Sequence, residues 1–405
     1  MTNNFKKRRK LIFSNLAKNE GFFVDSKTNL NINRFLFNSN IFYFTGIKQP
    51  GTKLLLYKDK SGKENEIMFI LNKDYDKEKW TGLRISKDET KNRSGIEKVY
   101  FNSKFKNIFT YVLNKIDLLY INYSKNVNLD KMNSDKRNFI SKIKFNFPSL
   151  VIKNSLDLII KLRTSKDNKE IKNLRKAIEY TKKALYHTWK VMKPGMYEYE
   201  IKAIFNHYLN KRNIDIAFNT TVASGENGVI LHYSHGTQKV ENGDLVLFDV
   251  GARFNGYSAD ISRTVPINGK FTDKQKEIYN IVLKTNKESI KNVKEGVTLK
   301  EIDKRAKEIL SEELIKRNII KEKKNLRKYY YHSIGHHLGL DTHDLSNKGE
   351  QLANSSVITI EPGLYMKKEK IGIRIEDDIL VKKNEGINLS SKIVKEVKDI
   401  ENLMN

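Results

Sequence analysis

Single acidic residues interrupt or end apolar runs in the second half of the chain, and these acids restrict how it can fold. Asp249 lies within the run at 245–251, and Glu361 ends the run at 357–361. Both runs have the length and the branched side chains of buried strands. A carboxylate inside such a strand is unfavourable unless a cation pairs with it or binds it. The fold must therefore bring a positively charged partner to each acid.

A second acid follows Asp249 across a predicted hairpin. The Asn-Gly pair at 255–256 is typical of a two-residue type I′ turn, which would place Phe254 opposite Tyr257 and Gly251 opposite Asp260. Side-chain alternation then puts Asp249 and Asp260 on one face as diagonal neighbours. We interpret Gly251 as leaving room there for the two acids and a cation. The alternative is a pair of surface acids on an edge hairpin.

Histidines concentrate in one later segment. Four of the eight histidines of the chain lie within residues 332–343, together with two glycines that allow close approach of backbone and ligand. We interpret His336 as a metal ligand and His332 and His343 as polar groups beside it. The spacing alone leaves the choice among these histidines open.

The last acidic cluster is at 372–378. Alternation places Arg374 and Glu376 on one face of a strand, with isoleucines on the other. An arginine there would orient a metal-bound carboxylate and lower its pKa. The alternative is an amphipathic strand with a surface ion pair.

Four carboxylates and one imidazole, without a thiol, form a donor set that suits divalent cations. Carboxylates can bridge, so four of them suit two ions better than one, and a pair of ions can activate water to attack an amide. The candidate ligands are Asp249, Asp260, His336, Glu361 and Glu376.

The 405 residues are enough for two domains. Residues 1–155 contain no histidine and have strand-like runs at 53–57, 67–71 and 118–122, and a helical pattern opens near 171. The second half repeats itself: Lys-Pro-Gly at 193–195 and Lys-Glu-Gly at 294–296 are each followed by Glu-Ile at the same spacing. Such a repeat predicts duplicated halves related by a pseudo-twofold axis, with a cleft between them.

Composition argues against other classes of protein. The net charge is +28, but the basic residues are scattered and no nucleic-acid-binding motif is recognisable, so we expect no nucleic-acid partner. No apolar run approaches the length of a membrane span, and no signal-peptide pattern follows the basic first residues. We therefore expect a soluble, cytoplasmic protein without a membrane partner.

These residues match a known family. The chain resembles the pita-bread metallopeptidases, and within them the aminopeptidase P subfamily, at residues 38–46, 79–84, 224–233, 262–264 and 269–271. The resemblance implies an α/β (α+β) protein with a smaller N-terminal α/β accessory domain at 1–155. A pita-bread catalytic domain with pseudo-twofold symmetry would follow at 156–405.

The resemblance also implies roles for individual residues. Asp249 would hold one ion, Asp260 and Glu376 would bridge two ions, usually manganese, and His336 and Glu361 would complete the second. Glu361 would also transfer a proton. His232 and His343 would contact substrate, and His332 and Arg374 would belong to the substrate pocket. Two departures are Asn40, where an acid is common, and His337, where an aromatic residue is usual.

The implied activity is release of the N-terminal residue from peptides with proline in second position. A dipeptidase of the prolidase type is the alternative, and a non-catalytic binding protein is a more remote one. The resemblance further implies a homo-oligomer, a dimer or a tetramer.

Overall fold

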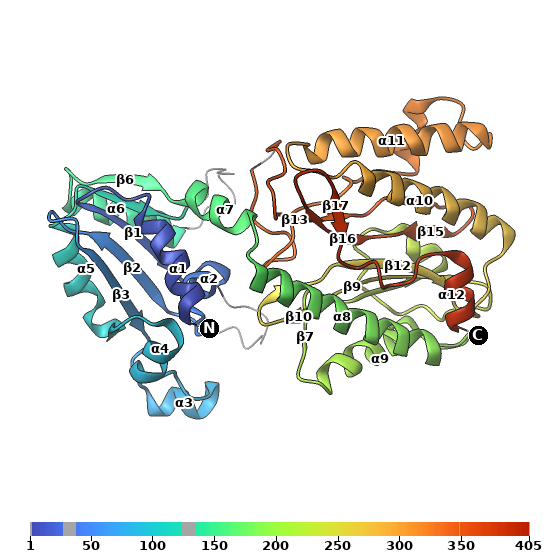
Figure 1. The fold of residues 1–405 in the computed structure, drawn as a ribbon. Coiled ribbons are helices and arrows are strands. Elements are labelled where there is room, and N and C mark those ends of the chain that lie inside the picture. Colours follow the sequence, from blue (N-terminus) through green and yellow to red (C-terminus); the bar gives the residue numbers. More distant parts are fainter. Residues whose placement is uncertain (1, 27–37, 124–133, 348, 405) are drawn as a thin grey trace. The chain divides into compact units, whose positions relative to one another are not determined.

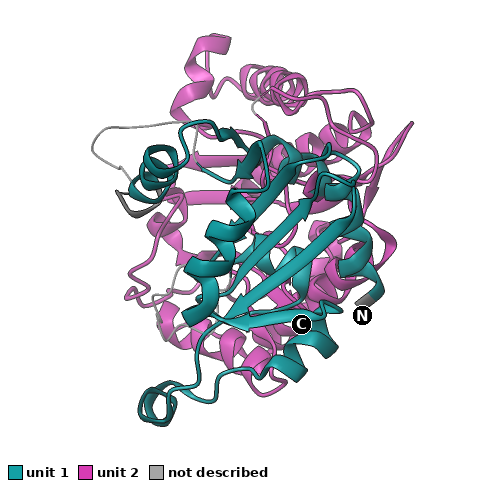
Figure 2. Cartoon of the chain, turned by 90° about the vertical axis from the view of Figure 1, so that its left-hand side faces the viewer, with its two compact units in different colours: residues 1–162 teal, residues 163–405 magenta. Residues whose placement is uncertain are grey.

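Apolar runs rich in branched and aromatic residues form the strands in both halves of the chain. The structure is a computed structural model that describes residues 2–26, 38–123, 134–347 and 349–404. Its contacts divide the chain into two compact units, residues 1–162 (unit 1) and 163–405 (unit 2) (Figures 1 and 2). Both units combine helices with sheets, as predicted for the α/β (α+β) class.

Unit 1 is built around one mixed sheet of six strands in the order β4-β3-β2-β1-β5-β6. The strands are β1 (Glu20–Asp25), β2 (Lys53–Lys58), β3 (Glu64–Ile70), β4 (Lys98–Phe101), β5 (Leu118–Ile121) and β6 (Val151–Asn154). The three predicted strand runs are confirmed as β2, β3 and β5. The helices are α1 (Thr2–Phe13), α2 (Ser39–Thr45), α3 (Tyr75–Thr81), α4 (Lys87–Ser94), α5 (Phe105–Leu113), α6 (Ser134–Asn146) and α7 (Leu156–Thr164), whose last two residues are assigned to unit 2.

Aromatic packing closes one core of unit 1. Phe23 on β1 lies 5.0 Å from Phe109 and 5.8 Å from Phe139, measured between ring centroids, which joins the sheet to α5 and α6. Such rings bury large apolar areas and prefer offset or tilted contacts. This core stabilises the sheet from the side of α5 and α6.

Unit 2 contains short antiparallel sheets and two long helix pairs. The sheets are β11-β10-β7, β12-β9-β8, β13-β16-β17 and β14-β15. Their strands are β7 (Asp215–Ile216), β8 (Thr221–Ser224), β9 (Leu245–Val250), β10 (Ala252–Phe254), β11 (Tyr257–Ser258), β12 (Ile261–Pro266), β13 (Val357–Ile360), β14 (Gly363–Met366), β15 (Ile371–Arg374), β16 (Asp377–Val381) and β17 (Gly386–Asn388). The helices are α8 (Asn168–Val191), α9 (Glu198–Asn210), α10 (Asp273–Lys291), α11 (Leu299–Lys316) and α12 (Val397–Met404). In Figure 1 the strands β9, β12 and β15 lie between α8 and α10.

The predicted repeat has a structural counterpart in these helix pairs. Each pair is joined by a turn with a glycine at positive φ, Gly195 at 91° and Gly296 at 86°, a conformation that favours glycine. In each second helix, a glutamate in the first turn accepts a hydrogen bond from the N-cap backbone, Glu200 at 2.7 Å and Glu301 at 2.8 Å. The sequence similarity therefore reflects two halves built alike. Among the described helices, none combines the length and the hydrophobicity needed to cross a membrane.

Candidate active site

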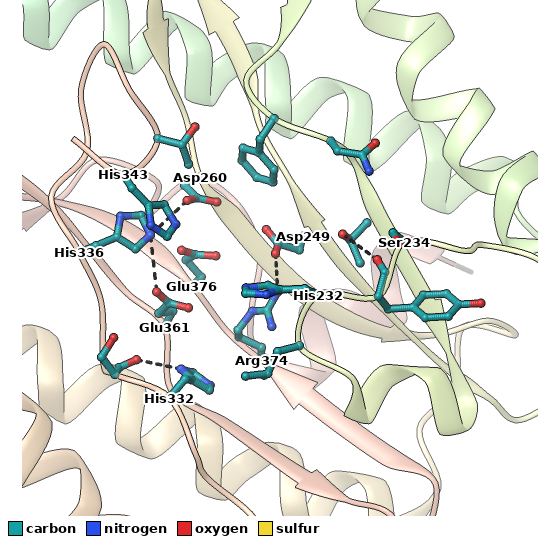
Figure 3. A pocket seen from close by; sticks show the side chains of 17 residues that line it. His232, Ser234, Asp249, Asp260, His332, His336, His343, Glu361, Arg374 and Glu376 are labelled. Atoms are coloured by element: carbon teal, nitrogen blue, oxygen red, sulfur yellow. Dashed lines mark hydrogen bonds and ion pairs between the residues drawn. The ribbon is translucent and has the colours of Figure 1, made fainter. Parts of the chain in front are cut away.

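One cavity in unit 2 collects the predicted site residues. Its volume is about 610 Å³, and its side chains point into a shared space (Figure 3). The lining includes His232, Asp249, Asp260, His332, His336, His343, Glu361, Arg374 and Glu376. These residues come from strands and loops far apart in the sequence.

The hairpin that carries Asp249 and Asp260 has the predicted register. Phe254 pairs with Tyr257 across the turn, and the same register continues between β9 and β12, where Asp249 pairs with Ser262. Asp260 therefore lies diagonally from Asp249, as the alternation predicted. The turn chemistry of two residues is enough to place both acids on one face.

The structure gives Gly251 a requirement that the sequence did not predict. A Cβ atom at this position would lie 2.0 Å from the carbonyl oxygen of Ala259 and 2.9 Å from the ring of Phe218. The glycine thus makes room for the backbone of the opposing strand and for an aromatic ring. A side chain at position 251 would collide with these groups first, before it filled the space between the two acids.

His336 and Glu361 are held together by backbone hydrogen bonds. The Thr359 amide donates to the His336 carbonyl and the Glu361 amide donates to the Ile334 carbonyl, each at 2.8 Å. A Cβ atom on Gly335 would lie 2.0 Å from the carbonyl oxygen of Thr359. The close approach predicted for the small residues of the histidine segment is therefore confirmed at Gly335.

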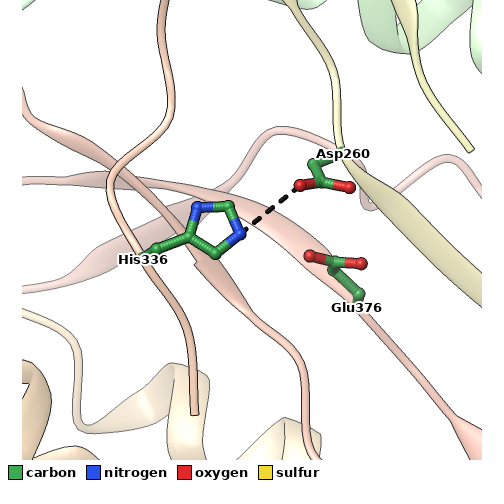
Figure 4. A group of neighbouring side chains, drawn as sticks. All are labelled: Asp260, His336 and Glu376. Carbon is green, nitrogen blue, oxygen red and sulfur yellow. Dashed lines mark ion pairs between the residues drawn. The ribbon is translucent and has the colours of Figure 1, made fainter. Parts of the chain in front are cut away.

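Three side chains form the tightest group of possible metal ligands. One donor atom from each of Asp260, His336 and Glu376 lies within 4.8 Å of the others (Figure 4). Nε2 of His336 is 3.4 Å from Oδ2 of Asp260 and 3.6 Å from Oε1 of Glu361. Asp249 is turned to a different partner, since its Oδ2 accepts a hydrogen bond from Arg374 at 2.7 Å.

The electrostatics of this group fit bound cations. Burial, together with the charge of Asp249, raises the pKa of Asp260 to about 6. Burial and the charges of Asp260 and Asp249 raise the pKa of Glu361 to about 7. Burial alone would lower the pKa of His336, but the hydrogen bond and charge of Asp260 raise it to about 9. Buried acids that repel one another in this way favour divalent cations of the kind that carboxylates and imidazole bind.

Arg374 supports two of the acids. Its Nε donates to Oγ of Ser262 at 2.7 Å, and that hydroxyl donates to Oε2 of Glu376 at 2.7 Å. With the bond to Asp249, the guanidinium fixes two carboxylates from two directions. The charge of Arg374 lowers the pKa of Glu376, as predicted. Burial and the neighbouring carboxylates outweigh this contribution and raise that pKa well above its usual value.

The histidines occupy different parts of the cavity. His332 is hydrogen-bonded through Nε2 to the hydroxyl of Tyr365 at 2.8 Å, and burial lowers its pKa to about 4. The rings of His336 and His343 stack with centroids 4.0 Å apart. His337, which stands where an aromatic residue is usual, is buried and is not among the residues that line the cavity.

Some functional neighbours were missed in the sequence. Ser262 and Tyr365 contact Arg374, and Phe218 lines the cavity. Ser262 is two residues after Asp260, so strand alternation could have identified it. No spacing marks Tyr365 or Phe218.

Comparison with known proteins points the same way as the geometry. Residues 172–383 match metallopeptidase family M24, and residues 5–120 match the aminopeptidase P N-terminal domain. The chain is 33% identical to the Xaa-Pro aminopeptidase of Escherichia coli, over 91% of this chain and 88% of that protein. It is 32% identical to the mitochondrial intermediate cleaving peptidase 55 of Arabidopsis thaliana, over 91% of this chain and 75% of that one.

Solved structures are similar over the full length. A zinc-substituted E. coli aminopeptidase P in complex with product superimposes with a TM-score of 0.89 at 30% identity, covering 100% of this chain and 98% of the other. The E. coli enzyme with the inhibitor Pro-Leu gives a TM-score of 0.88 at 30% identity with the same coverage. The similarity therefore extends over both units.

Proposed function

The chain belongs to metallopeptidase family M24, and on this premise we propose that it is a metallo-aminopeptidase that releases the N-terminal residue from peptides with proline in second position. The observation that supports this most is the convergence of four carboxylates and four histidines, His336 among them, on a single cavity. The relatives that share both parts of the chain include Xaa-Pro aminopeptidases.

We propose that two divalent ions, most suitably Mn²⁺, bind in this cavity. The ligands would be Asp249, Asp260, His336, Glu361 and Glu376. When bound, the ions would supply Lewis acidity toward the scissile carbonyl and a water activated for attack. Two observations support this assignment. The donors are carboxylate oxygens and one imidazole nitrogen, and the buried carboxylates repel one another.

The protein's own groups would bind the peptide and move protons. Glu361 lines the cavity with its Oε1 3.6 Å from Nε2 of His336, and its carboxylate would take a proton there and pass it to the leaving nitrogen. His232 and His343 would donate hydrogen bonds to the peptide backbone, and His332 would line the pocket. Proline has no backbone N–H, so its recognition depends on such a shaped pocket rather than on strand-like pairing.

Other features of this proposal concern the whole protein. We propose an accessory domain at 1–155 and a catalytic domain at 156–405, a boundary that stays a prediction. We also propose a homo-oligomer, a dimer or a tetramer, and a cytoplasmic location.

The direct test uses purified full-length protein loaded with Mn²⁺ and a peptide Xaa-Pro-Pro, with products identified by mass spectrometry. We expect release of the first residue, loss of activity with a chelator, and recovery with Mn²⁺. Cleavage of Xaa-Pro dipeptides alone would indicate a prolidase instead. A protein that binds no divalent ion and cleaves no prolyl substrate would overturn the proposal.

A further inference from the structure

A fully buried charged cluster includes Asp344, which directly follows the histidine segment at 332–343, and contains none of the proposed metal ligands. The side chains of Arg163, Lys166 and Asp344 are 2%, 1% and 2% exposed. Nζ of Lys166 is 3.2 Å from Oδ2 of Asp344, and Arg163 is hydrogen-bonded to Oδ1 of the same carboxylate. Arg163 also donates to Asp341 at 2.7 Å. We call Arg163, Lys166 and Asp344 the Asp344 cluster.

Burying charges of this kind is unfavourable unless close hydrogen bonds and ion pairs offset the loss of hydration. Stability alone is therefore a weak explanation for the cluster. The two cations come from the start of unit 2, while Asp344 follows directly after His343. Contacts across almost 180 residues of sequence, as between Lys166 and Asp344, fix one loop to a distant part of the same unit. The role of the cluster therefore depends on which side chains this loop carries to the cavity.

Asp344 organises the loop from 337 to 345. Its amide donates to the carbonyl of His337 at 2.8 Å, and its Oδ1 accepts from the amide of Leu345 at 2.9 Å. A Cβ atom on Gly339 would lie 2.0 Å from Oδ2 of Asp344. The carboxylate thus fills the inside of the loop and sets its backbone path.

This loop holds the His343 ring against the ring of His336, the residue directly before the loop, at the cavity. The rings of His336 and His343 stack with an interplanar angle of 25°, and both line the cavity (Figure 3). Within the described parts of the chain, no hydrogen bond holds the His343 ring itself. Its position therefore depends on this stacking and on the loop backbone that carries it.

We propose that the Asp344 cluster positions His343 for contact with the peptide substrate. This inference rests on the proposed function, because it assigns the cluster a part in the same reaction. Arg163, Lys166 and Asp344 are positioning residues, since they act through the loop and do not line the cavity. Their loss changes where His343 lies and leaves the other donors of the cavity in place.

The experiment is a double-mutant cycle in the full-length, Mn²⁺-loaded protein. The single variants are Asp344→Asn, which keeps the shape and removes the charge, and His343→Ala. We expect a loss in kcat/KM of about tenfold or more for the first and of about 100-fold for the second. If Asp344 acts through His343, the double variant should match His343→Ala within about twofold.

Independent effects would instead multiply, and this result would overturn the inference. Retained Mn²⁺ stoichiometry in Asp344→Asn is required, because loss of bound metal would also overturn it. Arg163→Lys, paired with His343→Ala in the same cycle, replaces Asp344→Asn if that variant does not fold.

A matched control is the ion pair in unit 1 between Arg9, which is buried, and Glu66, which is 21% exposed, with bonds of 3.0 Å to both carboxylate oxygens. Glu66→Gln should change kcat/KM by less than about twofold at a temperature where the protein is folded. Wild-type protein assayed beside the variants separates the two proposals. An inert wild type contradicts the proposed function, whereas an active wild type with multiplicative losses contradicts only the role of the cluster.

Discussion

Replacing Arg374 by lysine should weaken metal binding without removing any ligand. The guanidinium donates at 2.7 Å to both Asp249 and Ser262, and the serine passes the contact on to Glu376. A lysine ammonium is a single point donor on a flexible stem and cannot reproduce this planar, forked geometry. The variant therefore keeps one positive charge but leaves at least one of the two acids without its support.

The size of the effect follows from how many carboxylates Arg374 orients. Partners that orient metal ligands typically contribute 10–100-fold to metal affinity. At about 1.4 kcal/mol for each factor of ten, this corresponds to about 1.4–2.8 kcal/mol of binding free energy. Because Arg374 touches one acid directly and one through Ser262, we expect the upper part of this range.

Calorimetric titration of Mn²⁺ into chelator-treated protein measures the effect directly, with activity against free Mn²⁺ as a second readout. Arg374→Lys should shift both curves to higher metal concentration by a similar factor. Arg253→Lys is the matched control, since Arg253 is on β10, in the hairpin that carries Asp249 and Asp260, and donates to Ser258 and the Ala217 carbonyl. An Arg374→Lys protein that folds normally and binds Mn²⁺ within about twofold of wild type would refute the reasoning.

Three further predictions concern the same unit. Glu361→Gln should lower turnover by several orders of magnitude while the fold is retained; circular dichroism and steady-state kinetics check this, and near-normal turnover would contradict the proton-transfer role. Without metal, the free energy of unfolding should fall as pH rises from 7 to 9. The pKa of His336 is about 9 in the folded protein and near 6.5 in the unfolded chain, so the free energy of unfolding falls by up to about 1.4 kcal/mol per pH unit in this range. Denaturant titrations in the presence of chelator measure this change, and a free energy of unfolding that rises with pH would contradict the prediction. Gly335→Ala should destabilise the protein by about 1–3 kcal/mol, because the new Cβ would meet the carbonyl of Thr359. Gly228→Ala is the control and should be tolerated, because its Cβ would lie 3.6 Å from the nearest atom. Equal melting temperatures of the two variants would contradict this prediction.

The parts of the site that the sequence predicted are governed by local rules. The Asn-Gly turn sets the register from Phe254 and Tyr257 back to Asp249, so the relation of the first two acids needs no tertiary information. The repeat of the helix pairs was similarly readable, because both turns need a glycine at positive φ.

The parts that were missed depend on contacts between distant segments. Gly251 is required by the backbone at Ala259 and the ring of Phe218, and neither contact leaves a trace in the periodicity. The pKa of Glu376 is raised by its burial and by the acids that the fold places beside it, which a single strand pattern cannot reveal. Arg163 and Asp344 are 181 residues apart in the sequence, and nothing in the spacing of either residue indicates the other.

The two helix pairs divide the donors between them. Asp249 and Asp260 follow the first pair in the chain, and His336, Glu361 and Glu376 follow the second. A polypeptide cut between the halves, in the loop that ends β12, would yield two fragments that each carry an incomplete coordination sphere. Bound cations would then stabilise the association of the two fragments, so their complementation should depend on added metal.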